Sequence, residues 1–349
     1  MQRTSRKKEH IELAYQTGLS GRHGFEDVKF VHNCIPESAF SLTSLNTVIG
    51  GLSFSSPIII NAMTGGAHET AEVNRKLAIF ARECGLAMAV GSQMAAIKDP
   101  RTIESYTVAR QLNPNGILMA NLGAEATVAQ ALQAVEMIEA DMLQIHLNVM
   151  QELIMPEGDR DFRGVLERIE AIVEAAPCPV MIKEVGFGID FKAAEKLATL
   201  GIAALDIGGS GGTNFAKIEN ERRVDRLDMF HDWGLNTTQS LLEVAPLREG
   251  VDIIATGGIS NGLEIAKALS IGAKGVGMAG YFLKLALQAT EKEALLAIEQ
   301  LHHQLRIVMT ALGVDRLEQM GAQPVVISGD TYHWATMRGI DCAAYSQRS

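Results

Sequence analysis

The chain has 349 residues, 47% of them hydrophobic and 21% charged, with a formal net charge of −10. This length suits one large α/β domain or two medium ones, and the acidic balance argues against general nucleic-acid binding, which requires a basic surface. No secretory signal or membrane-spanning apolar run is visible, and the four cysteines lack metal-ligand spacing. We therefore expect a cytoplasmic protein that contacts neither membrane nor nucleic acid.

The first 50 residues form an N-terminal arm without clear strand-and-helix alternation. Basic residues, among them Arg6 and Lys7, cluster near its start. Such a cluster is typical of a solvated helix, or of an arm that brings positive charge to an anion.

From residue 57 onward, eight short apolar runs alternate with amphipathic helical segments. This alternation predicts a (β/α)8 TIM barrel, with a core over residues 51–283 and a C-terminal helix and tail over 284–349, all in a single domain. A doubly wound open sheet is the alternative, but no G-x-G-x-x-G follows the first run. His302 and His303 on the C-terminal helix are predicted to be surface or interface residues. The eight runs span residues 57–63, 86–92, 116–123, 141–148, 179–186, 202–209, 252–258 and 273–280.

The fourth run alternates apolar and polar residues. Gln144, His146 and Asn148 lie at spacing two, and Gln151 and Glu152 follow where the strand should end. A strand directs such residues to one face, and buried polar groups require partners. The pattern indicates either a hydrogen-bond network inside the barrel or a polar site at its mouth, and we favour the site.

The ends of the eight runs divide into two groups. The first five end in polar or charged side chains, and the last three end mainly in glycine, as in Gly257-Gly258 and Ala279-Gly280. Glycine lets backbone N–H groups approach an anion, and TIM barrels frequently bind phosphate on the last two loops. Tight turns that need glycine are the simpler explanation, but three successive glycine-rich ends favour a phosphate site.

Lys183 lies within an apolar run and needs a partner, because a buried ammonium is costly. It could form a structural ion pair with Glu184 or Asp206, face an anionic cofactor ring, or form a Schiff base. The residues alone leave these alternatives open.

The motifs taken together resemble the type 2 isopentenyl-diphosphate isomerases, which are FMN-dependent TIM barrels. The resemblance extends from the arm to about Gly280, with a similar tail beyond. The most specific strings are QIHLNVMQE and DIGGSGGTNF, and RKxxH, NAMTGG, VGSQ, ANLG, PEGDR, KEVGFG, TGGI and GMAG accompany them.

This resemblance implies interconversion of isopentenyl and dimethylallyl diphosphate with reduced FMN, Mg²⁺ and NADPH as reductant, in a homo-oligomer, a tetramer or octamer. Glu152 would bind the metal, and Gln151, His146 and Lys183 would be the catalytic residues. The expected substrate contacts are Arg6, Lys7, Ser92, Gln93, His146, Asn148 and Gln151. The expected FMN contacts are Ala62, Met63, Thr64, Ser92, Asn121, Lys183, Thr213, Gly257, Gly258, Ile259, Ala279 and Gly280.

One position departs from the family pattern. Some relatives carry an arginine in the loop after the second strand, where this chain has Met94, so the resemblance does not carry over a diphosphate contact at this position, and Ser92 or Gln93 could contribute instead. Because Gln151 is a poor acid or base and Glu152 would be occupied by metal, the reduced flavin is expected to carry the proton.

Two other functions compete with this interpretation. An FMN oxidoreductase of the 2-hydroxyacid oxidase kind would carry a His-Gly-x-Arg signature late in the barrel, and none follows Lys183. A non-catalytic flavin- or phosphate-binding protein would not require so many inward polar groups on the fourth run.

Overall fold

Eight parallel strands close into a barrel in the computed structural model, which describes residues 21–348. They follow one another around the barrel in chain order, and the last strand pairs with the first. Every strand falls within one of the eight predicted runs, so the predicted TIM barrel is confirmed. The barrel strands are β4 (Ile58–Ile60), β5 (Ala87–Ala89), β6 (Leu118–Gly123), β7 (Met142–Leu147), β8 (Val180–Glu184), β9 (Ala204–Asp206), β10 (Asp252–Thr256) and β11 (Gly275–Met278).

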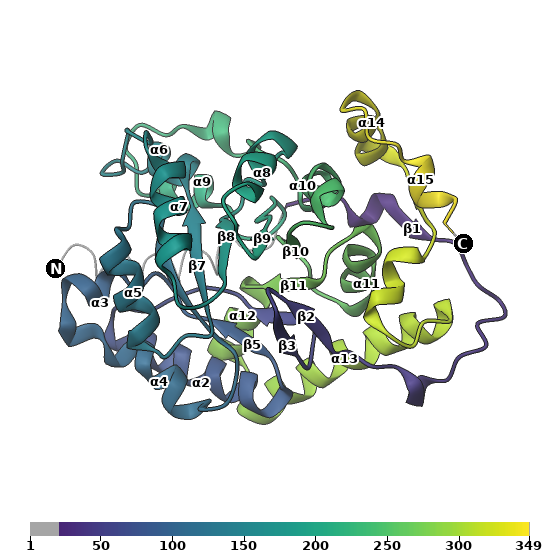
Figure 1. Cartoon of the computed structure of the whole chain (residues 1–349), viewed down its shortest axis with the longest axis horizontal. Helices are drawn as coiled ribbons and strands as arrows, with labels where there is room; N and C mark the ends of the chain where they lie inside the picture. Colours follow the sequence, from purple (N-terminus) through teal and green to yellow (C-terminus); the bar gives the residue numbers. More distant parts are fainter. Residues whose placement is uncertain (1–20, 349) are drawn as a thin grey trace.

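Helices surround the barrel and connect its strands (Figure 1). Polar side chains cap several of them: Asp190 accepts a hydrogen bond from the Ala193 N–H at the start of α8, as N-cap residues commonly do. None of the helices within residues 21–348 is long and apolar enough to cross a membrane. The helices on the barrel are α2 (His68–Cys84), α3 (Met94–Lys98), α4 (Glu104–Leu112), α5 (Val128–Met137), α6 (Val149–Ile154), α7 (Val165–Ala175), α8 (Phe191–Ala198), α9 (Phe215–Glu221), α10 (Thr237–Val244), α11 (Gly262–Ile271) and α12 (Gly280–Gln288).

The two faces of each strand build two different cores. On β7, Leu143 and Ile145 belong to the layer between strands and helices, whereas Met142 packs inside the barrel with Met119 and Met181. Gln144 and His146 follow Met142 at spacing two and share its inward face. The interior is therefore apolar at the amino ends of the strands and polar at their carboxyl ends.

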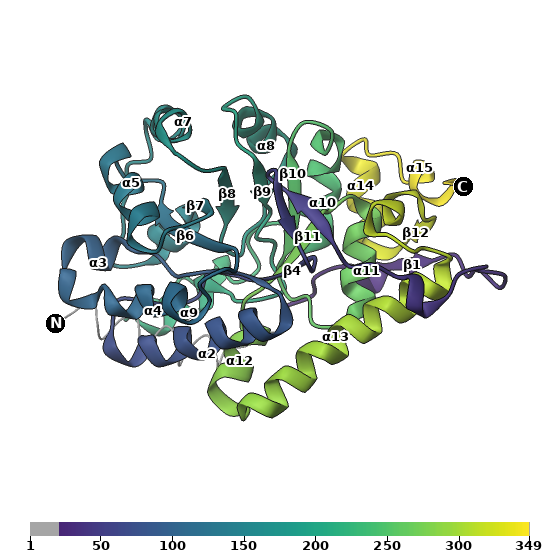
Figure 2. The same ribbon diagram turned by 60° about the horizontal axis from the view of Figure 1, so that its bottom comes forward.

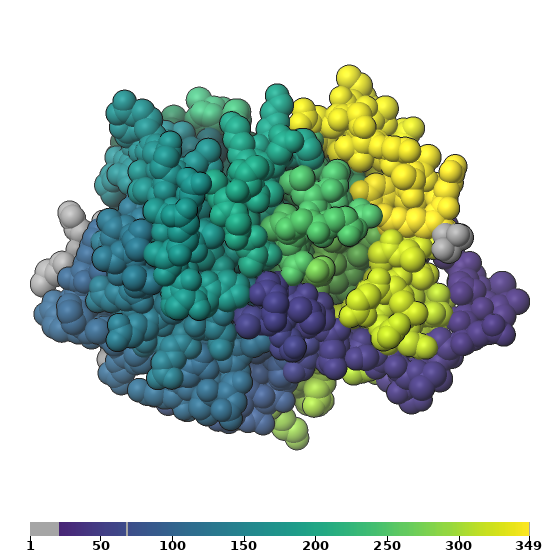
Figure 3. Space-filling model, in the orientation of Figure 1, coloured from purple at the N-terminus to yellow at the C-terminus, as the bar shows by residue number. Residues whose placement is uncertain are grey.

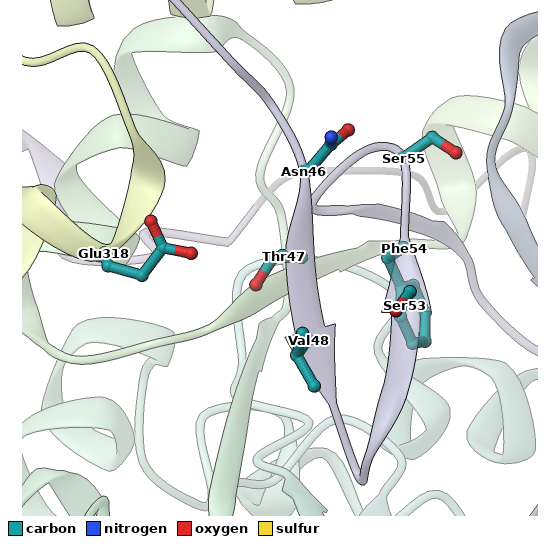
Figure 4. A pocket seen from close by; sticks show the side chains of 7 residues that line it. All are labelled: Asn46, Thr47, Val48, Ser53, Phe54, Ser55 and Glu318. Atoms are coloured by element: carbon teal, nitrogen blue, oxygen red, sulfur yellow. The ribbon is translucent and has the colours of Figure 1, made fainter.

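A β-hairpin closes the amino end of the barrel. It consists of β2 (Thr47–Ile49) and β3 (Leu52–Phe54), and Ile49 and Phe54 join the apolar interior. It lies on the face seen in Figure 3, where its atoms are purple. The expected boundary between arm and barrel, at residues 50 and 51, falls in the turn of this hairpin. A pocket of about 260 Å³ beside it is lined by residues 46–48, 53–55 and Glu318 (Figure 4), at the end of the barrel opposite its polar interior.

The segments on either side of the barrel meet in space. β1 (Val28–Phe30) pairs antiparallel with β12 (Val325–Ile327), a pairing that the sequence did not predict. The long helix α13 (Glu291–Leu312) packs on α11 and α2 and runs along the lower edge in Figure 2. His303 on α13 is exposed, as predicted, but His302 is half-buried and its Nε2 lies 2.8 Å from Ser56 Oγ. The remaining helices are α14 (Gly329–Met337) and α15 (Ala343–Ser346).

Candidate active site

Polar side chains from neighbouring strands meet inside the barrel near its carboxyl end. Asn121 on β6 is paired in register with Gln144 on β7, His146 with Lys183 on β8, and Lys183 with Asp206 on β9. Residues opposite one another on adjacent strands share a face, so all of them point into the interior. We use the name polar belt for Asn61, which follows β4, together with Asn121, Gln144, His146, Lys183 and Asp206.

Lys183 is the buried cation of the polar belt. Its Nζ lies 3.4 Å from Asp206 Oδ2 and donates a 2.8 Å hydrogen bond to the backbone oxygen of Glu184. These contacts explain why an apolar strand tolerates a lysine, since a buried ammonium without partners would be costly. The structural ion pair considered from the sequence is thus present, and Asp206 is its partner.

Glu184, the neighbour of Lys183, shapes the loop after β8. Its Oε2 accepts hydrogen bonds from the backbone N–H groups of Gly186, Phe187 and Gly188. Burial raises the pKa of the carboxyl to about 7, against the opposite effect of the Phe187 and Gly186 N–H groups and of Lys183. Strand alternation directs Glu184 away from the polar belt, so its role is to hold the loop.

His146 is a half-buried imidazole of the polar belt. Its Nδ1 lies 2.9 Å from Asn121 Oδ1. Burial and the nearby Lys183 ammonium lower the pKa of His146 to about 4, while the Leu122 carbonyl acts in the opposite direction. The side chain is therefore neutral at neutral pH and can accept a hydrogen bond or a proton.

The short helix α6 brings three predicted site residues together directly after β7. Glu152 accepts hydrogen bonds from Asn148 Nδ2 and from the backbone N–H of Asp159, both at 2.9 Å. Gln151 Nε2 donates a 3.0 Å hydrogen bond to Oε1 of Glu219 on α9. Glu219 is fully buried and also forms an ion pair with Arg222. The carboxylate of Glu152 remains half-buried at the edge of the site.

The glycine-rich loops after β9 and β10 pack against one another. Gly257 and Gly258 have φ values of 121° and 82°, which favour glycine. A Cβ at Gly257 would lie 2.1 Å from the Gly209 oxygen. Tight packing therefore requires these glycines, whatever else the loops bind. Thr213 lies half-buried beside them, Ile259 is buried, and Ala279 and Gly280 form the start of α12.

The predicted site residues after β4 and β5 differ in how deeply they are buried. Ala62 and Met63 are half-buried, whereas Thr64 is buried and its carbonyl accepts a hydrogen bond from the Gly91 N–H. Ser92 is half-buried, and its carbonyl accepts a hydrogen bond from the Tyr106 hydroxyl.

The position of Gln93 argues against its expected contact with substrate. Its side chain is fully buried, donates to the Ala134 carbonyl of α5 and accepts from the Asn121 N–H. The amide thus lies between strand and helix rather than at the barrel mouth. Met94 beside it is also buried.

The described chain begins at the glycine-rich side of the mouth. A Cβ at Gly21 would lie 2.8 Å from Gly211, and the His23 carbonyl accepts hydrogen bonds from the Thr238 N–H and hydroxyl. His23 Nε2 lies 3.3 Å from Glu264 Oε1. Arg6 and Lys7 lie outside the described residues.

Three residues in or beside the site were not predicted as site residues: Asn61, Asp206 and Glu219. The sequence indicated Asp206 only as a partner of Lys183. Asn61 and Glu219 carried no signal, because a single polar residue at the end of an apolar run or on a helix is common. Within the described residues, no three His, Cys, Asp or Glu side chains are grouped to hold a metal ion. A metal at Glu152 would therefore need ligands from water or substrate.

Known proteins resemble this chain over its whole length. The isopentenyl-diphosphate delta-isomerase of Bacillus cytotoxicus is 53% identical over 349 residues, covering 100% of both chains, and that of Bacillus pumilus is 51% identical over 350 residues, covering 100% of this chain and 99% of the relative. Residues 101–327 match the FMN-dependent dehydrogenase family. This chain belongs to the type 2, FMN-dependent isopentenyl-diphosphate delta-isomerases.

Solved structures outside the isopentenyl-diphosphate delta-isomerases share the fold. A lactate oxidase of Pediococcus acidilactici superposes with a TM-score of 0.68 at 18% identity, over 93% of this chain and 94% of the oxidase. A flavocytochrome b2 mutant superposes with a TM-score of 0.69 at 18% identity, over 91% of this chain and 82% of the flavocytochrome. At these identities the similarity establishes the barrel fold alone.

Proposed function

We propose that the chain interconverts isopentenyl diphosphate and dimethylallyl diphosphate by moving a proton between two carbons of the substrate. The observation that carries the proposal is the meeting of the polar belt with the Asn148–Glu152 segment at the carboxyl end of one barrel. This end combines a buried cation, a neutral imidazole and a carboxylate, in a chain that belongs to the isomerase family.

The residues present fit FMN. Lys183 provides a cation beside the barrel interior, suited to an anionic reduced ring, and the backbone around Thr213, Gly257, Gly258, Ile259 and Gly280 suits its phosphate. Ala62, Met63, Thr64, Ser92, Asn121 and Ala279 are proposed to line the rest of the cofactor site. When bound and reduced by NADPH, FMN supplies the acid–base group that the side chains lack.

The substrate is proposed to bind on the β7 side of the barrel mouth. Glu152 supplies one carboxylate, and Mg²⁺ is typically bound through one or two carboxylates together with substrate phosphate and water. Asn148, His146 and Ser92 would contact the substrate, and Gln151 would orient the reacting group. Because 15 residues span up to about 50 Å, Arg6 and Lys7 are within reach of the diphosphate from the Gly21 position. The active form is proposed to be a cytoplasmic homo-oligomer, a tetramer or octamer.

An anaerobic assay tests the proposal. The purified protein is given FMN, NADPH, Mg²⁺ and isopentenyl diphosphate, and dimethylallyl diphosphate is measured. Product should form only when the flavin is reduced and Mg²⁺ is present. Absence of product with fully reduced, bound flavin would overturn the proposal, and oxidation of a 2-hydroxyacid by the same preparation would favour an oxidase instead.

A further inference from the structure

Asp206 is surrounded by hydrogen-bond donors on both of its oxygens. Oδ1 accepts from the Thr256 hydroxyl and, at 3.2 Å, from the Gly208 N–H. Oδ2 accepts from Asn61 Nδ2 at 2.6 Å and lies 3.4 Å from Lys183 Nζ. Thr256 itself accepts from the Gly208 N–H, so its hydroxyl proton is available to Asp206. A fully buried carboxylate among four donors is an ionised acceptor.

This acceptor sets the orientation of the Asn61 amide. Only the NH₂ group of Asn61 can face the carboxylate, because a carbonyl oxygen would be repelled. The contact of the amide oxygen requires the same orientation, since Asn61 Oδ1 accepts a hydrogen bond from the Ala62 N–H at 2.8 Å. Rotating the amide by 180° would break both contacts at once.

The orientation is passed on through two further amides. Asn61 Oδ1 accepts from Gln144 Nε2 at 3.3 Å, which leaves Gln144 Oε1 to accept from Asn121 Nδ2 at 3.1 Å. Asn121 Oδ1 then faces His146 Nδ1 at 2.9 Å. Each amide uses its NH₂ toward Asp206 and its oxygen toward His146, so the chain of hydrogen bonds has one direction.

At the end of this chain, His146 Nδ1 meets an oxygen that can only accept. Nδ1 must therefore carry the proton, and in a neutral imidazole the lone pair then lies on Nε2. We propose that Asp206 is a positioning residue that sets the tautomer of His146, through Asn61, Gln144 and Asn121, so that Nε2 is its proton-accepting nitrogen. The ion pair with Lys183 accounts for only one of the four contacts that Asp206 makes.

The catalytic consequence rests on the proposed function, whereas the tautomer itself does not. If His146 contacts the substrate, Nε2 can accept a hydrogen bond from a protonated group without rearrangement. It can donate to a phosphate oxygen only after taking up a proton. Asp206 would thereby determine which kind of group His146 can bind when substrate arrives.

The tautomer can be measured in the FMN-loaded protein without substrate. Histidine-specific ¹⁵N labelling allows NMR to distinguish a protonated from an unprotonated ring nitrogen, and long-range proton couplings identify which is Nδ1. Comparison with His146→Gln assigns the signals. We expect a single neutral form protonated at Nδ1 near neutral pH. A form protonated at Nε2 would overturn the proposal, whether or not the enzyme is active.

Two variants interrupt the chain of hydrogen bonds at different points. Asp206→Asn places an NH₂ group among donors, but it also leaves Lys183 without its counter-ion. Gln144→Met leaves the Lys183–Asp206 pair intact, and the Gln144 amide already lies beside the sulfurs of Met119 and Met181, so a methionine is suited to this position. In both variants we expect a mixture of His146 tautomers.

Thr256→Val is the matched control, because it removes a contact of Asp206 that lies outside the chain leading to His146. It should leave the tautomer unchanged. An unchanged tautomer in folded Gln144→Met protein would contradict the proposal, as would a mixture in Thr256→Val. In Gln144→Met, isomerase kcat should also fall by about tenfold, because a His146 in the wrong tautomer loses about one hydrogen bond to the substrate. An unchanged kcat despite mixed tautomers would show that Asp206 sets the tautomer of His146 but that this tautomer does not affect catalysis.

Discussion

The side-chain amide of Gln151 donates a 3.0 Å hydrogen bond to the buried carboxylate of Glu219. This contact joins α6, which carries Gln151 and Glu152, to α9 in the long connection between β9 and β10. It orients the amide, because a carboxylate acceptor holds the NH₂ group of Gln151 and leaves its oxygen for another partner. The position of Gln151 thus depends on a residue far along the chain.

Replacing Glu219 with Gln should therefore reduce catalysis more than substrate binding. The Gln151 amide would lose its fixed orientation, and Arg222 would lose its ion pair with Glu219. We expect kcat to fall about 10- to 100-fold, the scale of a lost positioning contact, with KM changed little, as measured in anaerobic steady-state assays. Glu221→Gln, an exposed neighbour on the same helix, should keep both constants. A Glu219→Gln enzyme with normal kcat would show that the orientation of Gln151 does not matter.

The barrel could be predicted from sequence because hydrophobic periodicity is local. Each apolar run contains its strand, and inward residues at spacing two on β7 marked the polar interior. The network itself could not be predicted, because it depends on which strands are neighbours. Asn61 and Asp206 are distant in sequence, yet Asn61 Nδ2 lies 2.6 Å from Asp206 Oδ2 in the barrel. Gln93 was misleading, because its position after a strand does not reveal that its side chain turns toward α5.

Replacing Lys183 with Ala should weaken FMN binding strongly. The substitution removes the cation proposed to face the reduced ring and leaves the buried Asp206 carboxylate without its counter-ion. We expect the dissociation constant for FMN to rise at least about tenfold, equivalent to about 1.4 kcal/mol, as measured by flavin fluorescence during titration. Lys192→Ala, an exposed lysine on α8, is the control. Normal flavin content together with normal activity in Lys183→Ala would refute the role.

Replacing Glu152 with Gln should raise the Mg²⁺ concentration needed for half-maximal activity. An amide oxygen is a neutral and weaker ligand for a hard cation than a carboxylate, but it can still accept the hydrogen bond from Asn148. We expect a shift of about tenfold or more in a metal titration at saturating substrate. Glu170→Gln, at an exposed site on α7, should leave the titration unchanged. An unaltered titration in Glu152→Gln would exclude metal ligation by this residue.

Substitutions of Arg6 and Lys7 test whether the arm reaches the substrate. Gly21 lies against Gly211 at the barrel mouth, close enough for the preceding residues to contact a diphosphate there. Arg6→Ala and Lys7→Ala should each raise KM about 10- to 150-fold, since hydrogen bonds to charged groups contribute about 1.5–3 kcal/mol. Lys284→Ala, at an exposed position on α12, should not change KM. An unchanged KM in both arm variants would place the arm elsewhere.

The half-buried His302 should make the protein less stable in mild acid. Burial and the nearby Arg306 lower the pKa of His302 from 6.5 to about 4. Between these values the unfolded chain binds a proton that the folded chain does not. The stabilisation is therefore complete above pH 6.5 and is lost as the pH falls toward 4.

Replacing His302 with Gln removes this titration, while an amide can still form a hydrogen bond with Ser56. Wild-type protein should lose up to about 2 kcal/mol more unfolding free energy than the variant between pH 6.5 and pH 5, because one proton contributes about 1.4 kcal/mol per pH unit. Urea unfolding at both pH values measures this difference. His303→Gln, its exposed neighbour on α13, should follow wild type. Parallel losses in wild type and His302→Gln would show that His302 is protonated equally in the folded and unfolded states.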